Sequence, residues 1–109
     1  MSFRLISDIV LDDRTLSDGT DVFIVSTSVK GADITLTLPV DTDASGKFYF
    51  VKNINTNLFN VIVVAGGGEN IVDGMTSVPS TTITPGERAV RFFRAPTNLD
   101  QSVSVWMRE

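Results

Sequence analysis

The sequence predicts an all-β domain, and three observations carry that prediction. Residues 33–38 alternate polar and apolar side chains without a break, which is the pattern of a strand with one buried and one exposed face. Short apolar runs are separated by Gly, Pro, Asn and Asp at about ten residues per strand. No window carries apolar residues at helical spacing over three turns. We therefore expect a single antiparallel β-sandwich or barrel-like domain without a helix.

Turn residues divide the chain into the expected strands. Pro39 ends the alternating run because it has no N–H to donate to a ladder, and Ser17–Thr20 and Pro85-Gly86 are typical of tight turns. A polar turn at 41–46 predicts that the strands on either side of it are antiparallel neighbours. The expected strands are Phe3–Leu11, Val22–Ser28, Asp33–Leu38, Lys47–Asn53, Asn60–Val64, Thr76–Thr84, Arg88–Ala95 and Ser102–Arg108, with a shorter piece at Asn70–Val72 left open.

The alternating faces of the middle strands predict the hydrophobic core. On each of these strands, one set of every-second residues is consistently apolar and is expected to point inward. The predicted core residues are Ile34, Leu36, Leu38, Phe48, Phe50, Val61 and Val63.

Three runs, at 22–25, 48–51 and 61–64, are apolar on both faces. A small two-layer domain has only one inner face per sheet, so such strands need a second cover, and another subunit is the simplest one. The alternative is that some outward Val and Phe side chains are merely exposed, as is common on protein surfaces. We expect self-association, with arginines pairing with acids at the rim. The predicted interface residues are Phe23, Val25, Tyr49, Val51, Ile62, Val64, Arg88, Arg91 and Arg94.

The composition excludes several classes of function. The 109 residues include no His and no Cys, which removes Ser-His and Cys-His nucleophiles, thiolate or imidazole zinc sites and disulfides. The formal net charge of −4 argues against a nucleic-acid surface, which needs clustered cations to neutralise phosphates. The arginines Arg88, Arg91, Arg94 and Arg108 are spread over two expected strands and are interrupted by acids, so they do not predict such a cluster. No apolar run is long enough for a membrane span, and no secretory signal is visible at Met1–Arg4. We expect a non-enzymatic protein without a cofactor.

The remaining chemical candidates are weak. The loop Gly66–Asn70 follows a strand but lacks the Gly-Lys-Ser/Thr ending of a phosphate loop. Neither Asp41 with Asp43 nor Asp12, Asp13 and Asp18 is accompanied by the glutamate that closes a calcium loop, so surface turn acids are the better interpretation. Lys47 or Lys52 could form an acid–base pair with the nearby Tyr49, but nothing in the sequence indicates a pocket around them. We therefore favour the interpretation that they are strand-surface residues. We expect no metal and no catalytic residue.

The order of the middle segments resembles a known module. The segments are Val22–Ser28, Ile34–Pro39, Gly46–Asn53, Asn60–Val64 and Glu69–Gly74, followed by Trp106. In this order they resemble a β module that recurs in the virion proteins of tailed bacteriophages, including tail fibres, head fibres and decoration-type proteins. The segment from Arg94 to Gln101 departs from the polar turn usual near the end of that module.

The resemblance implies a homotrimeric structural protein of the virion, attached to a phage capsid or tail protein. Residues 1–13 lie outside the resembling part and are expected to form an arm or anchor, with 14–109 as a single β domain. A carbohydrate-binding module of a tail fibre is the alternative, with Tyr49, Phe59 or Trp106 stacking on the sugars of a host glycan. A small hydrolase using carboxylates is a third alternative, but no suitably spaced acid pair supports it.

Overall fold

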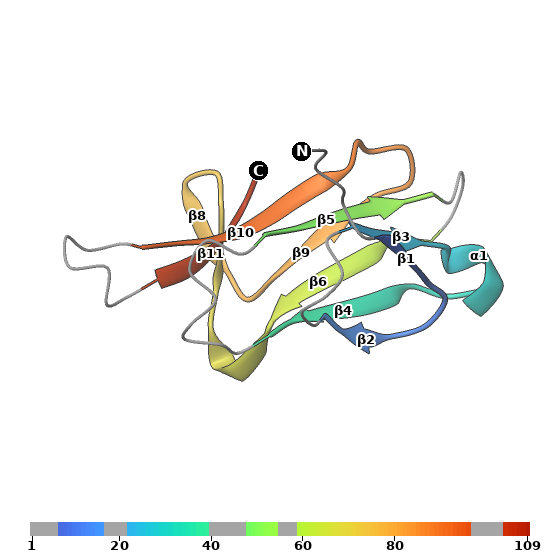
Figure 1. Ribbon diagram of the computed structural model, residues 1–109, viewed down its shortest axis with the longest axis horizontal. Coiled ribbons are helices and arrows are strands. Elements are labelled where there is room, and N and C mark those ends of the chain that lie inside the picture. Colours follow the sequence, from blue (N-terminus) through green and yellow to red (C-terminus); the bar gives the residue numbers. More distant parts are fainter. Residues whose placement is uncertain (1–6, 17–21, 40–47, 55–58, 97–103) are drawn as a thin grey trace, which may run out of the picture.

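The chain folds into two β-sheets, as the computed structural model in Figure 1 shows. The structure describes residues 7–16, 22–39, 48–54, 59–96 and 104–109. One sheet has seven strands in the order β1-β3-β5-β10-β11-β7-β8, and the other has four in the order β2-β4-β6-β9. The expectation of an all-β fold is confirmed.

Most strands lie within the expected runs, but the two-residue strand β2 was not expected. The larger sheet contains β1 (Ser7–Val10), β3 (Val22–Val25), β5 (Phe48–Asn53), β10 (Val90–Pro96), β11 (Ser104–Arg108), β7 (Ile71–Asp73) and β8 (Thr76–Val78). The smaller sheet contains β2 (Arg14–Thr15), β4 (Ile34–Leu38), β6 (Val61–Ala65) and β9 (Ser80–Ile83). The short strand left open at 70–72 is present as β7. The run expected at 76–84 is divided at Pro79, with β8 in one sheet and β9 in the other.

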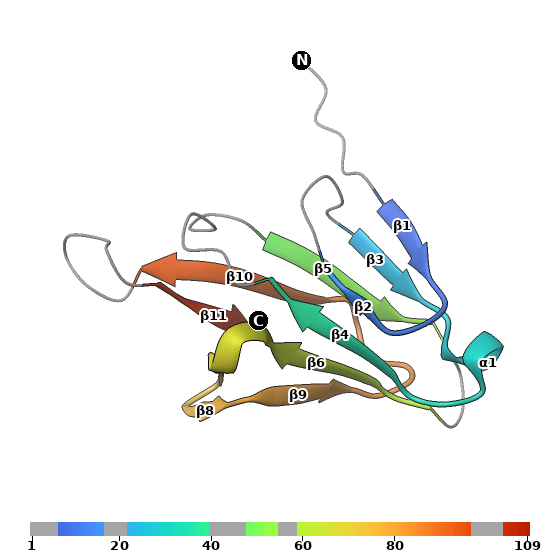
Figure 2. The same ribbon diagram turned by 90° about the horizontal axis from the view of Figure 1, so that it is seen from below.

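The prediction of an antiparallel fold is wrong, because both sheets are mixed. Strand β3 runs parallel to both of its neighbours, β1 and β5, and β4 runs parallel to β2 and β6. Antiparallel pairs join β5 to β10, β10 to β11, β6 to β9 and β7 to β8. The strands β4 and β5, expected to be neighbours, lie in different sheets, as Figure 2 shows. Alternation along a strand fixes which side chains face inward, but it does not choose the neighbouring strand.

A short helix, α1 (Thr27–Lys30), interrupts the run that was expected to remain a strand to Ser28. The expectation of no helix is therefore wrong at this point. Gly31 ends the helix with a φ of 71°, a backbone angle that glycine adopts without strain, and its N–H donates to the Thr27 carbonyl. One helical turn is too short to produce a helical period in the sequence.

One hydrophobic core collects side chains from both sheets. The predicted core residues of β4 and β6 are confirmed, but Phe48 and Phe50 of β5 are only half-buried. Strand β5 instead buries Tyr49, Val51 and Asn53. The fully buried residues of largest volume are Trp106, Phe23, Phe92, Leu16, Ile34, Leu36, Leu38, Ile71, Ile83, Val25, Val51 and Val61.

Residues 7–13 belong to the folded body, which corrects the expected arm boundary at residue 13. Strand β1 pairs in parallel with β3, and Val10 is buried in the core. The Asp8 carboxylate lies 2.6 Å from the Arg14 guanidinium, and Asp13 accepts hydrogen bonds from Lys30 and from the Thr35 backbone. Residues 1–6 of the expected arm lie outside the described part of the chain.

Candidate functional site

Four of the predicted interface residues lie in the core of a single chain. Phe23, Val25 and Val51 are completely buried, and Tyr49 is 2 % exposed. The strand register explains why they share one face: Phe23 pairs with Val51, and Tyr49 pairs with the buried Phe92. The prediction that these side chains lie on the outside of the sheet is therefore wrong. The residues between them face outward instead.

The outward residues of the seven-stranded sheet form a broad apolar surface, which we call the outer face. Its members follow from the register, because directly paired residues point to the same side of a sheet. The apolar and cationic members of the outer face are Ile9, Val22, Ile24, Phe48, Phe50, Lys52, Val72, Arg91, Phe93, Ala95, Val105 and Met107. All of these are half-buried except Ile9, which is 63 % exposed. The register also places three exposed polar residues, Ser7, Ser77 and Glu109, on this side of the sheet. None of the described elements lies across this face.

Phenylalanines occupy the centre of the outer face. Phe93 of β10 pairs with Phe48 of β5 on one side and with Met107 of β11 on the other. Phe50 pairs with Val22, and its ring meets that of Phe48 edge to face at a centroid separation of 5.5 Å. The direct partner of Phe50 on β10 is Arg91, so the apolar surface continues from Phe50 to Phe48 along β5 and from there across β10 to β11.

The two cations on the outer face are both engaged within the chain. Lys52 donates a hydrogen bond to the Glu87 carbonyl, and Arg91 forms an ion pair with Glu109. The Arg91 guanidinium also lies over the Phe93 ring, 4.7 Å from its centroid. These contacts give both cations partners that they could retain if a second surface covered the face.

The other predicted arginines differ in their surroundings. Arg94 is only 6 % exposed, and its guanidinium donates to both Glu69 carboxylate oxygens at 3.0 and 2.7 Å. It also lies over the Trp106 ring, so it belongs to the buried side of the sheet rather than to a rim. Arg88 is exposed, as a rim residue would be.

Ile62 and Val64 face outward, as predicted, but from the four-stranded sheet. Thr35 and Thr82 flank Ile62 in the register, and Thr37 and Ser80 flank Val64. This second outward surface is therefore dominated by hydroxyl side chains. It provides a natural comparison with the outer face.

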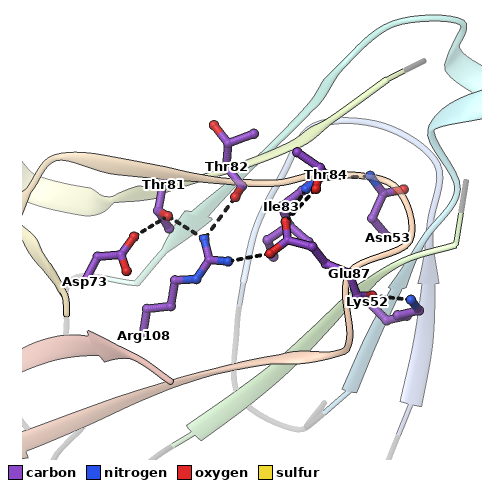
Figure 3. Close-up of polar contacts among 9 residues, drawn as sticks. All are labelled: Lys52, Asn53, Asp73, Thr81, Thr82, Ile83, Thr84, Glu87 and Arg108. Carbon is purple, nitrogen blue, oxygen red and sulfur yellow. Dashed lines mark hydrogen bonds and ion pairs between the residues drawn. The ribbon is translucent and has the colours of Figure 1, made fainter. Parts of the chain in front are cut away.

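A polar network joins the two sheets beside the core (Figure 3). Arg108 of β11 donates to the Thr81 hydroxyl at 2.6 Å, to the Thr82 carbonyl at 2.9 Å and to Glu87 at 2.9 Å. The Thr81 hydroxyl in turn donates to Asp73. Partial burial raises the pKa of Glu87, but hydrogen bonds from Thr84 and the nearby Arg108 outweigh it and leave the pKa below its usual value. The network holds β9 against the larger sheet.

The weak chemical candidates gain no catalytic arrangement in the described residues. Tyr49 points into the core and Lys52 to the outer face, so the acid–base pair imagined for them does not form. Asp12 and Asp13 both form ion pairs with Lys30. Asp18, Asp41, Asp43 and Lys47 lie outside the described residues. Among those described, no three His, Cys, Asp or Glu side chains gather where they could hold a metal ion.

The structure also tests the aromatic platform expected of a carbohydrate-binding module. Tyr49 is buried and Trp106 is completely so, and their rings contact each other with centroids 5.8 Å apart. Neither ring can stack on a sugar at the surface, so that part of the alternative is wrong. Phe59 is half-buried.

The glycine loop that was compared with a phosphate loop contains the short 3-10 turn η1 (Gly66–Gly68), in which Gly67 and Gly68 have positive φ.

The sequence contained one signal that could have identified the outer face. Lysine is almost never fully buried, and Lys52 shares its face of β5 with Phe48 and Phe50. Because every second residue of a strand shares a face, an outward Lys52 places the two phenylalanines outside and leaves Tyr49 and Val51 for the core. Asn53 offered the opposite signal, but its amide is buried as a donor to the Phe59 and Ile83 carbonyls.

Comparisons of this chain with protein-family models, with curated proteins and with solved structures found no significant match. No helix within the described ranges is long and apolar enough to cross a bilayer.

Proposed function

We propose that this protein is a structural protein of a tailed-bacteriophage particle, a small capsid decoration, head-fibre or tail accessory protein. It acts without catalysis or a cofactor, by self-association into a homotrimer and attachment to a capsid or tail protein. Its two sheets pack as a β-sandwich that presents one apolar outer face for assembly. Its working location is the virion.

The outer face is the observation that carries this proposal. Contiguous apolar patches larger than a few hundred Å² are uncommon on monomeric soluble proteins and mark surfaces that bind other macromolecules. A row of Phe48, Phe50, Phe93 and Met107 across neighbouring strands is of this kind. The resemblance of segments such as Val22–Ser28 and Asn60–Val64 to phage appendage modules, in their order along the chain, supports the class of particle.

Imaging of the purified native phage particles tests the proposal. Antibody labelling of the particles and averaging of the labelled structures should place the protein on the head or the tail, in density that accommodates three copies. A labelled density at each attachment point that accommodates only one chain would contradict the trimer. Absence of the protein from purified, infectious particles would overturn the virion assignment.

A further inference from the structure

We infer that a second copy of this chain covers the outer face, sheet against sheet, with Phe48, Phe50 and Phe93 at the centre of the contact. The inference rests on the self-association in the proposed function and deepens it by assigning the surface. Two outer faces that cover each other completely close as a dimer, so the proposed trimer requires each outer face to be shared between its two neighbours about the axis. It also replaces the interface predicted from the sequence, four of whose apolar residues lie in the core.

The chemistry of the outer face is that of an interface centre. Such centres are rich in aromatic residues and Met and poor in charge, and a few buried aromatic anchors provide most of the binding energy. Phe48, Phe93 and Met107 are directly paired across β5, β10 and β11, and the Phe50 ring contacts that of Phe48, so the four side chains form one cluster instead of scattered exposed residues. Half of each side chain's surface or more is already covered by its neighbours, which reduces the entropy lost on docking.

The charges of the outer face favour a copy of the same chain as its occupant. The chain carries a net charge of −4, which makes two copies repel each other in general. Among the described residues, the charges of the outer face are Lys52, Arg91 and Glu109, and Glu109 forms an ion pair with Arg91, its direct partner across the two strands. The acid of the outer face therefore already has a cation beside it in its own chain, and the Arg91–Glu109 pair offers both signs of charge to the same pair of a second copy.

The shape of the surface also fits another sheet. Apolar sheets pack face to face about 10 Å apart, so a suitable partner presents another apolar sheet. A second copy of the chain has such a sheet. Neighbouring strands lie about 4.8 Å apart, and the outer face extends over six strands from β1 to β7, giving a width of about 24 Å. Four residues of strand add a height of about 13 Å. The product of these lengths, about 310 Å², is less than half of the about 800 Å² that a standard interface buries per partner, so the apolar centre must be joined by the residues around it.

Sedimentation velocity on matched variants tests the inference. The test variant combines Phe50→Ser with Phe93→Ser, and the control combines Ile62→Ser with Val64→Ser on the outward surface of the other sheet. All four positions are half-buried and outward-facing, so circular dichroism should show both variants folded. Met107→Lys is a second test variant for the case in which the double phenylalanine variant does not fold.

We expect the wild type and the control to sediment as a multiple of one chain at micromolar concentrations. The outer-face variants should sediment as single chains, with the association constant reduced at least 100-fold. If the wild type associates and the outer-face variants retain the same mass, this surface is not the interface, although the proposed homotrimer survives. If the wild type is a single chain, the second copy is excluded here, whereas attachment to the particle is decided separately by the imaging experiment. A mass of two chains supports this face and contradicts the trimer.

Discussion

Single residues decide which side of each strand faces the core. Asn53 is completely buried, and its side-chain amide donates to the carbonyls of Phe59 and Ile83, so a polar group occupies an inner position without losing its hydrogen bonds. Arg94 is similarly accommodated by its two hydrogen bonds to Glu69. Polar residues of this kind fix the faces of β5 and β10 and direct their phenylalanines 48, 50 and 93 outward.

Leu36→Ala should lower the free energy of unfolding by about 2 to 5 kcal/mol. Leu36 is completely buried in β4, so truncation loses transfer free energy and leaves a cavity. Urea unfolding measures the change, and Thr37→Ala, one residue along on the outward face, is the matched control with a smaller expected loss. A loss below about 0.5 kcal/mol for Leu36→Ala would mean that the assigned face of β4 is wrong.

Acid should destabilise the protein in a window set by its paired carboxylates. Hydrogen bonding from Arg14 lowers the pKa of Asp8. The Asp13 backbone N–H and Lys30 lower the pKa of Asp12, and Lys30 and the Thr35 backbone N–H lower that of Asp13. The pKa of Glu87 is also lowered, as described above. Groups with depressed pKa values stabilise the fold above their ordinary pKa values, 3.8 for Asp and 4.5 for Glu, and this contribution is lost as the pH falls through the lowered values.

The free energy of unfolding should therefore change little between pH 7 and about pH 5 and fall below about pH 4. Glu87→Gln should be less stable than the wild type at neutral pH and should lose less stability on acidification, because it no longer titrates. Denaturant unfolding across this pH range measures, for each protein, the slope of the free energy of unfolding against pH. Equal slopes for the two proteins would show that the contacts of the Glu87 carboxylate with Thr84 and Arg108 do not stabilise its charged form in the folded state.

At the scale of elements, local pattern predicted where strands lie but not how they are joined. The perfect alternation of 33–38 gave β4 its bounds and its inner face, and 61–64 likewise matched most of β6. The run 48–51 is apolar at every position, so alternation could not choose between Phe48 with Phe50 and Tyr49 with Val51. Parallel pairing of β3 with β5 depends on contacts between segments distant in sequence, which no local pattern contains.

The outer face was missed for the same reason. The doubly apolar runs indicated that a second surface must cover the sheet. Which residues that surface contacts depends on which face of each strand points into the core. Strand β3 reversed the expected assignment by burying Phe23 and Val25, so Val22 and Ile24 face outward. The helix α1 could not be predicted because one turn has no measurable period, although Gly31 supplied a typical terminating residue.

Removal of residues 1–13 tests the role of β1 as an element of the fold. The deletion removes the edge strand that pairs with β3, the buried Val10 and the Asp13 acceptor of the Thr35 N–H. Loss of Val10 burial alone should cost about 1.5 kcal/mol or more. The control deletion removes only residues 1–6 and leaves β1 in place.

Denaturant unfolding of the two truncated proteins compares their stabilities. We expect the 1–13 deletion to be clearly less stable than the 1–6 deletion. If the two are equally stable, β1 contributes nothing to the fold, and residues 1–13 would then be the separable arm expected from the sequence. Incorporation of both proteins into phage particles would further show whether attachment requires residues 1–6 or β1.

At the scale of the whole molecule, the two sheets bury one set of faces against a shared core and differ in the faces they leave outward. Polar contacts tie the sheets at their margins, with Asp8 and Arg14 between β1 and β2 and Arg108 with Thr81 between β11 and β9. The outward surface of the smaller sheet is rich in threonine, whereas the outer face is apolar across six strands. This asymmetry is the basis for proposing an assembly protein whose copies meet through one sheet.

The dependence of thermal stability on protein concentration tests this claim most directly. If copies cover one another's outer faces, folding and association form one equilibrium, and dilution favours the unfolded chain. A 100-fold increase in wild-type concentration should raise Tm by several degrees, since about 2.7 kcal/mol of mass action is then added per association step. The Phe50→Ser, Phe93→Ser variant should melt at one temperature throughout. A wild-type Tm that does not change with concentration, for a protein that unfolds reversibly, would contradict assembly through the outer face.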